Sequence, residues 1–133
     1  MAVLVDTSVW SLALRRRSPQ SHPSSETLKR LLEQGEDVVL PGIVLQEILS
    51  GIRAPEQYER IRSALSIFPL VAVERDDYEE AAALANRCRA GGVQAGTIDA
   101  LIATITLRRG LSLLTADADF RAIARFCPLV LMD

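Results

Sequence analysis

Thiol and imidazole groups are scarce in this chain of 133 residues. It contains two cysteines, Cys88 and Cys127, which lie 39 positions apart without a CxxC motif, and one histidine, His22. Thiolate zinc sites use closely spaced cysteine pairs, and small cytosolic domains rarely carry disulfides, so we expect two reduced thiols. A lone histidine in a loop does not by itself supply an acid–base mechanism that depends on imidazole groups.

Long apolar runs are absent as well. No stretch approaches the roughly 18 uncharged residues that cross a bilayer, and the N-terminus lacks a basic region followed by an apolar segment and a cleavage site. These two absences argue against membrane insertion and against secretion. We therefore expect a cytoplasmic protein that has no membrane partner.

Aromatic residues make up only 5% of the chain, whereas hydrophobic residues make up 49%. This composition predicts a compact core of Val, Leu, Ile and Ala, and the length predicts one domain over residues 1–133. The net charge is −2, from 17 acidic and 15 basic residues. If four of the acids hold a metal ion, the basic residues outnumber the remaining acids, which is compatible with a substrate that carries phosphates.

Five short runs rich in Val, Leu and Ile are typical of buried strands. They cover residues 2–5, 38–40, 70–73, 111–114 and 129–131. Between them lie segments with apolar residues at three- and four-residue spacing, which is typical of helices. The alternation of strands and helices predicts an α/β fold of three layers, α/β/α, around a mostly parallel sheet of four to five strands.

Local signals suggest where several helices begin and end. Ser25 fits the N-cap of a helix that Gly35 stops, and a later helix is expected to begin at Asp76 or Asp77. Arg108 and Arg109 lie at the carboxyl end of the helix that starts near Asp99, where positive charge complements the helix dipole.

The basic segment Arg15–Arg17 is followed by Ser- and Pro-rich residues and is predicted to be an exposed loop. A solvated surface loop and a contact with RNA are both compatible with this run.

Five carboxylates lie at the ends of apolar runs, where packing gives no reason for a charge. They are Asp6, Glu47, Asp99, Asp117 and Asp119. Burying an ionised carboxylate is costly unless an opposite charge pairs with it. Since few basic residues are nearby in sequence, we expect a bound divalent cation. Ligand sets that contain only oxygen select hard ions, so Mg²⁺ or Mn²⁺ fits better than Zn²⁺.

The positions of these acids predict one shared site. Asp6 and Asp117 directly follow strands, and ligands of open α/β sheets collect outside the carboxyl ends of the strands. Asp99 lies in the first turn of its helix, and Glu47 borders an apolar helix stripe. A cation held there assists phosphodiester hydrolysis by lowering the pKa of a bound water and polarising the phosphoryl oxygen. The number of carboxylates is compatible with one ion or two.

The order of these residues resembles that of PIN-domain ribonucleases. The resemblance is carried by Asp6-Thr7-Ser8, by Glu47 within a helix, by Asp99-Ala100-Leu101-Ile102-Ala103 and by Thr115-Ala116-Asp117-Ala118-Asp119-Phe120. It spans essentially the whole chain, whose length is similar to that of the VapC-type toxins of bacterial toxin–antitoxin pairs.

This resemblance implies a PIN-like fold, an endoribonuclease that depends on Mg²⁺ or Mn²⁺, an RNA substrate, a homodimer, and a VapB-like antitoxin that blocks the site. The catalytic metal ligands that it implies are Asp6, Glu47, Asp99 and Asp117, with the hydroxyls of Ser8 and Thr115 and the carboxylate of Asp119 in support. Asp119 is placed in the supporting set because family members differ in which acid of the last motif reaches the metal.

Other interpretations remain open for single residues and for the whole chain. Asp6, Asp117 and Asp119 each fit an N-cap when considered alone, and Asp99 fits a first-turn acid. The sequence Asp6-Thr7-Ser8 is also similar to the start of aspartyl-phosphate phosphatases, but these need an acid at the position of Ser8. A catalytically inactive PIN-like module that binds RNA or a protein partner is the alternative to the nuclease.

Overall fold

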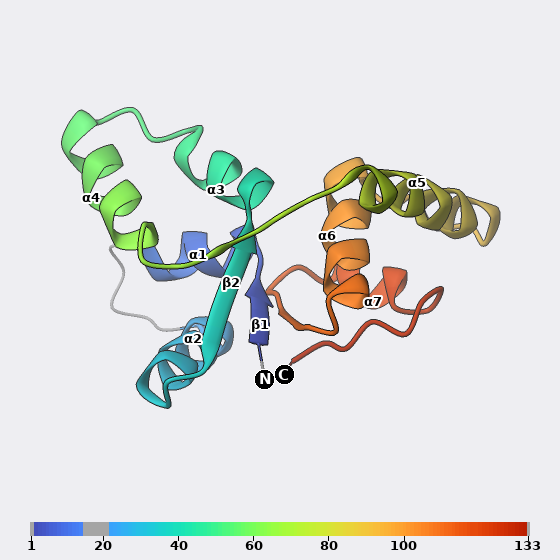
Figure 1. Cartoon of the computed structure of the whole chain (residues 1–133), viewed down its shortest axis with the longest axis horizontal. Helices are drawn as coiled ribbons and strands as arrows, with labels where there is room; N and C mark the ends of the chain where they lie inside the picture. Colours follow the sequence, from blue (N-terminus) through green and yellow to red (C-terminus); the bar gives the residue numbers. More distant parts are fainter. Residues whose placement is uncertain (1, 15–21, 133) are drawn as a thin grey trace.

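The computed structural model describes residues 2–14 and 22–132, which form four strands and seven helices (Figure 1). In chain order they are β1 (Ala2–Val5), α1 (Thr7–Leu14), α2 (Pro23–Glu33), β2 (Asp37–Pro41), α3 (Gly42–Leu49), α4 (Pro55–Leu65), β3 (Leu70–Val71), α5 (Arg75–Ala90), α6 (Thr97–Arg108), β4 (Ser112–Leu114) and α7 (Asp119–Ile123). The Arg15–Arg17 run lies outside the described residues. None of the helices within the described ranges is both long and apolar enough to cross a membrane.

All strand pairs of the sheet are parallel, in the order β3-β2-β1-β4. The first strand therefore lies between the second and the last, with Val3 opposite Val38 and Val5 opposite Leu114. This arrangement confirms the predicted α/β fold and parallel sheet. It also brings the residues that follow β1 and β4 to the same edge.

The strand expected at residues 129–131 is reduced to a single parallel bridge between Leu113 and Leu131. Leu113 donates its N–H to the carbonyl of Val130 at 2.8 Å and accepts the N–H of Met132 at 2.9 Å. Because Leu113 alone makes this exchange, the sheet has four strands and an extended segment beside its β4 edge.

Helices cover both faces of the sheet, which makes the three predicted layers. Figure 1 shows α1, α2, α3 and α4 to one side of strands β1 and β2, and α5, α6 and α7 to the other. The strands are apolar on both faces for this reason: Leu4, Val5 and Leu114 are all at most 1% exposed. Trp10 connects α1 to β1 by a hydrogen bond, because its Nε1 donates to the carbonyl of Val5 at 3.0 Å.

Helix α2 begins before the predicted N-cap. His22 caps it, and Pro23 is its first residue. Proline is favoured there because a backbone N–H at the first helical position would have no partner within the helix. Ser25 lies inside the helix, and its hydroxyl donates to the carbonyl of His22 at 2.9 Å. The expectation that Ser25 is the cap is wrong because His22 accepts the free N–H of Ser24.

A buried ion-pair group joins the start of α5 to the end of α6. Asp77 is 1% exposed, and its two oxygens accept hydrogen bonds from Arg108 Nε at 2.8 Å and Arg109 Nη2 at 2.6 Å. Arg109 also donates to the carbonyl of Ala72 at 2.8 Å. The two arginines therefore hold a distant carboxylate in addition to lying at a helix end.

Candidate active site

Asp6 directly follows β1 and is 4% exposed, with its carboxylate held from several sides. Oδ1 accepts the hydroxyl of Ser8 at 2.6 Å and the N–H of Val9 at 3.4 Å, and Oδ2 accepts the hydroxyl of Thr115 at 2.7 Å. Burial raises the pKa of Asp6, and these hydrogen bonds oppose the rise because they favour the ionised form.

The pairing of β1 with β4 brings this network together. Asp6 donates its backbone N–H to the carbonyl of Leu114 at 3.1 Å. Beyond that point the hydroxyl of Ser8 accepts the N–H of Ala116 at 3.0 Å, and the hydroxyl of Thr115 accepts the N–H of Asp117 at 3.0 Å. The two hydroxyls thus connect Asp6 to the loop that carries Asp117.

Three carboxylates meet where α6, the loop after β4 and α7 approach one another. Asp99, Asp117 and Asp119 each present an oxygen, and these oxygens lie within 4.8 Å of one another. A hydrogen bond within the loop orients the side chain of Asp117, whose Oδ1 accepts the N–H of Asp119 at 2.9 Å. This contact brings the second acid of the motif into the group, while Ala118 holds the N-cap position of α7.

The negative charges of the other four candidate acids act on the carboxylate of Asp99. Burial, followed by the negative charges of Asp117, Asp6, Asp119 and Glu47 in that order of effect, raises the pKa of Asp99 to about 6. Asp117, Asp6, Asp119 and Glu47 therefore lie close enough to Asp99 for their charges to act on its carboxylate.

Glu47 lies on α3, 40 positions along the chain from Thr7. Its Oε1 accepts the hydroxyl of Thr7 at 2.8 Å, which holds the glutamate toward the end of β1. Sequence reasoning did not single out Thr7. Its position between Asp6 and Ser8 was the available signal, because a hydroxyl at the end of a strand can bridge to a neighbouring helix.

Within residues 2–14 and 22–132, no positive side chain forms an ion pair with this group of acids. The donor set is made only of oxygens, and the neighbouring negative charges disfavour the ionised form of Asp99. Both features fit a hard divalent cation such as Mg²⁺ or Mn²⁺.

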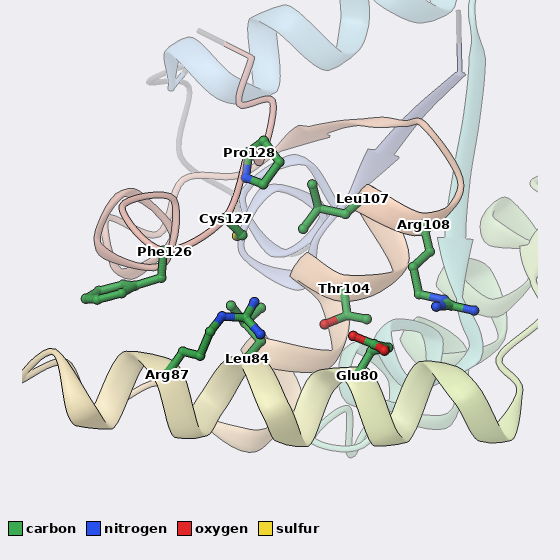
Figure 2. A pocket seen from close by; sticks show the side chains of 9 residues that line it. All are labelled: Glu80, Leu84, Arg87, Thr104, Leu107, Arg108, Phe126, Cys127 and Pro128. Atoms are coloured by element: carbon green, nitrogen blue, oxygen red, sulfur yellow. The ribbon is translucent and has the colours of Figure 1, made fainter.

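A separate cavity of about 370 Å³ lies between α5, α6 and the segment after α7 (Figure 2). Its walls include Leu84, Arg87, Phe126 and Cys127, and Figure 2 shows the side chain of Arg87 rising from α5 into it. None of the five acids lines this cavity. The candidate active site is therefore the carboxylate group at the edge of the sheet.

Known proteins share both the sequence pattern and the fold. The sequence profile of the PIN domain matches residues 3–126. Ribonuclease VapC11 from Mycobacterium tuberculosis (strain ATCC 25618 / H37Rv) is 29% identical over 129 residues, covering 96% of this chain and 95% of the relative.

Solved structures give the same result for the fold. VapBC2 from Rickettsia felis, solved with a DNA fragment from its promoter, superposes with a TM-score of 0.79 at 20% identity, covering 99% of this chain and 98% of the other. VapBC-5 from Mycobacterium tuberculosis, a member of the VapBC family of toxin–antitoxin systems, gives 0.72 at 20% identity, covering 98% and 97%. With the profile match over nearly its full length, the chain belongs to the PIN domain family.

Proposed function

We propose that this protein is an endoribonuclease that hydrolyses RNA phosphodiester bonds with the help of a divalent cation, and that it acts as the toxin of a toxin–antitoxin pair. The observation that carries the proposal is the group of Asp99 and four other carboxylates, none of which forms an ion pair within the described residues, in a chain of the PIN domain family. The ribonuclease named among its relatives supports the reaction class.

Mg²⁺ or Mn²⁺ would be held by Asp6, Glu47, Asp99 and Asp117, and Asp119 joins them because its carboxylate lies within 4.8 Å of Asp99 and Asp117. When bound, such an ion lowers the pKa of a water and stabilises charge on the phosphoryl oxygens. The hydroxyls of Ser8 and Thr115 orient Asp6, and their hydrogen bonds favour its ionised form. One carboxylate of the group accepts a hydrogen bond from the attacking water.

The partners follow from the same chemistry. An acidic site without a cation of its own attracts a positive side chain, so a VapB-like antitoxin would block it by inserting an arginine or lysine. The VapBC complexes among the structural neighbours support such a partner. We further propose a homodimer that acts on RNA in the cytoplasm. Failure of the protein to co-purify with the product of the neighbouring open reading frame would count against the antitoxin.

The experiment that tests the nuclease compares wild type, Asp99→Asn and Asp76→Asn, each freed of antitoxin. Asp76 is an exposed acid on α5 and provides a matched change of charge. Each protein is incubated with total cellular RNA in Mg²⁺ or Mn²⁺, with and without EDTA. Discrete fragments from wild type and Asp76→Asn that need metal, and that Asp99→Asn does not produce, are expected.

The contrary outcome is equally clear. If all three folded proteins leave the RNA intact, the proposed reaction is wrong. RNA binding retained by all three would then favour an inactive PIN-like module.

A further inference from the structure

A second cavity, of about 300 Å³, shares a wall with the candidate active site. It lies between the start of α2, the end of β4 and α7, and both Thr115 and Asp117 line it. Two other lining residues, His22 and Arg121, carry groups that bind anions, and Leu131 adds apolar surface. A cavity of this volume is at the small end of the range for ligand sites, which suits one nucleotide better than a peptide segment.

His22 faces this cavity in a defined tautomer. Its Nδ1 accepts the backbone N–H of Ser24 at 3.1 Å as part of the α2 cap, and lies 2.7 Å from the hydroxyl of the same serine. A ring nitrogen that accepts an N–H carries no proton, so the neutral imidazole carries its proton on Nε2. Within the described part of the chain Nε2 has no hydrogen-bond partner, which leaves it as a free donor.

Arg121 is the cationic group of this cavity. It lies on α7, two residues after Asp119, and is exposed. In contrast to Arg108 and Arg109, it forms no ion pair with any residue that the structure describes. Its guanidinium is therefore available to a ligand, and guanidinium groups suit phosphate because they donate two parallel hydrogen bonds.

We propose that this cavity binds the nucleotide next to the scissile phosphate of the RNA substrate. Arg121 pairs with its phosphate oxygens, Nε2–H of His22 donates a hydrogen bond to it, and Leu131 contacts its base or ribose. The proposal rests on the proposed function, because the wall that contains Asp117 is shared with the cleavage centre. An acidic centre repels phosphate, so an adjacent positive group is needed to bring the substrate in.

The lone histidine makes the first test direct. Imidazole ¹⁵N and ¹H NMR signals of this protein come from His22 alone, so the tautomer and its contacts can be read without assignment. We expect the Nε2–H form in the free protein. CMP or AMP, added in EDTA, should shift these signals saturably, and Arg121→Gln should weaken that binding.

An acidic hexapeptide serves as the competing probe. If it shifts the His22 signals and the nucleotides do not, the cavity binds a protein partner, and the assignment to RNA is overturned.

The second test measures binding of a labelled single-stranded RNA 12-mer in EDTA, where metal-dependent cleavage does not occur. Arg121→Gln should weaken binding roughly tenfold and lower the slope of log K against log salt by about 0.7, the value for one phosphate contact on a single strand. Arg87→Gln, an exposed arginine on α5 that lines the other cavity, is the matched control and should leave both quantities unchanged. Equal effects of the two variants would overturn the proposal.

His22 is tested by separating its two roles. Asparagine is a good N-cap, so His22→Asn keeps the start of α2 but removes the Nε2 donor, whereas His22→Ala removes both. We expect both variants to bind the 12-mer several-fold more weakly, and only His22→Ala to melt at a lower temperature. Wild-type affinity of His22→Asn would show that His22 is only a cap. All of these readouts are independent of cleavage, so an absent nuclease and an absent nucleotide site give different results.

Discussion

Two acids of this molecule, Asp77 and Asp99, have opposite electrostatic surroundings. Asp77 is 1% exposed and is surrounded by donors: Arg109 and Arg108 hold its oxygens, and the N–H of Glu74 adds a bond of 2.8 Å. Its pKa is well below the ordinary range, mainly because of Arg109. Asp99 faces four other carboxylates, and its pKa is raised to about 6 by burial and by those charges.

The difference separates an acid that stabilises the fold from acids that form a site. A paired carboxylate fixes two helices and loses its reactivity, because its charge is already satisfied. An unpaired group is unstable by itself and gains stability from whatever cation binds to it. Among the residues that the structure describes, no arginine pairs with Asp99, and this is as informative as the two arginines that pair with Asp77.

The largest expected effect is on catalysis. Asp99→Asn removes a carboxylate charge from the middle of the group of acids. It should lower the rate of RNA cleavage by at least about 100-fold, which raises the activation free energy by about 2.7 kcal/mol. Asp77→Asn should keep cleavage within a few-fold of wild type at a temperature where it is folded. Single-turnover cleavage of a fragment found in the total-RNA experiment measures both. Equal losses in the two variants would remove the distinction between the two acids.

The second largest expected effect is on stability, and here Asp77→Asn is the more damaging of the two substitutions. Asp77→Asn leaves two arginines without their shared partner and should lower the free energy of unfolding by about 2 to 4 kcal/mol, a figure reduced because Arg108 and Arg109 are 40% and 29% exposed. The melting temperature should fall by about 10 °C. Asp76→Asn, one residue away and exposed, is the control. A change below 1 kcal/mol would show that the pair contributes little.

The pH dependence of stability should differ in sign between the two acids. Asp99 binds its proton more tightly in the folded protein, since its pKa is about 6, so its contribution to stability falls as the pH rises from about 4 to 6, by at most about 3 kcal/mol. The lowered pKa of Asp77 gives a contribution that is full above about pH 4 and is lost as the pH falls further.

Urea unfolding in EDTA between pH 4.5 and 8 measures this. The stability of Asp99→Asn relative to wild type should grow up to about pH 6 and then level off. A constant difference over the whole range would contradict the raised pKa.

The smallest effect is that of metal on the melting temperature. Millimolar Mn²⁺ should stabilise the wild type by about 1 to 3 kcal/mol, because an ion that binds only the folded state shifts the equilibrium by mass action. Asp77→Asn should show the same increase from its lower starting point, and Asp99→Asn should show none. A full metal response in Asp99→Asn would place the ion elsewhere.

Local patterns predicted the frame of this fold well. The runs of Val, Leu and Ile at residues 2–5 and 38–40 are strands, because only a sheet covered on both faces buries such runs. Asp6 and Asp117 also follow neighbouring parallel strands at one edge of the sheet, as the chain direction of the strands requires, whereas Glu47 and Asp99 lie on helices α3 and α6. Their metal ligation remains a prediction.

The rest depends on contacts between residues that are distant in sequence. Asp77 meets Arg108 and Arg109 from 31 and 32 positions away, and nothing in the local sequence distinguishes these arginines from those that only complement a helix end. Thr7 meets Glu47 across 40 positions for the same reason. The last strand was overestimated because hydrogen bonds to Leu113 alone determine its length.

The position of β1 beside β4 has a consequence for synthesis of the protein. Asp6 is made before Thr115 and Asp117, which complete its surroundings and come more than a hundred residues later in the chain. A nascent chain folds from its N-terminus, and a pairing of such long range waits for the later strand. Until β4 has been made and has docked against β1, the acids of the nascent chain are still dispersed, so the site cannot assemble before its own chain is almost finished.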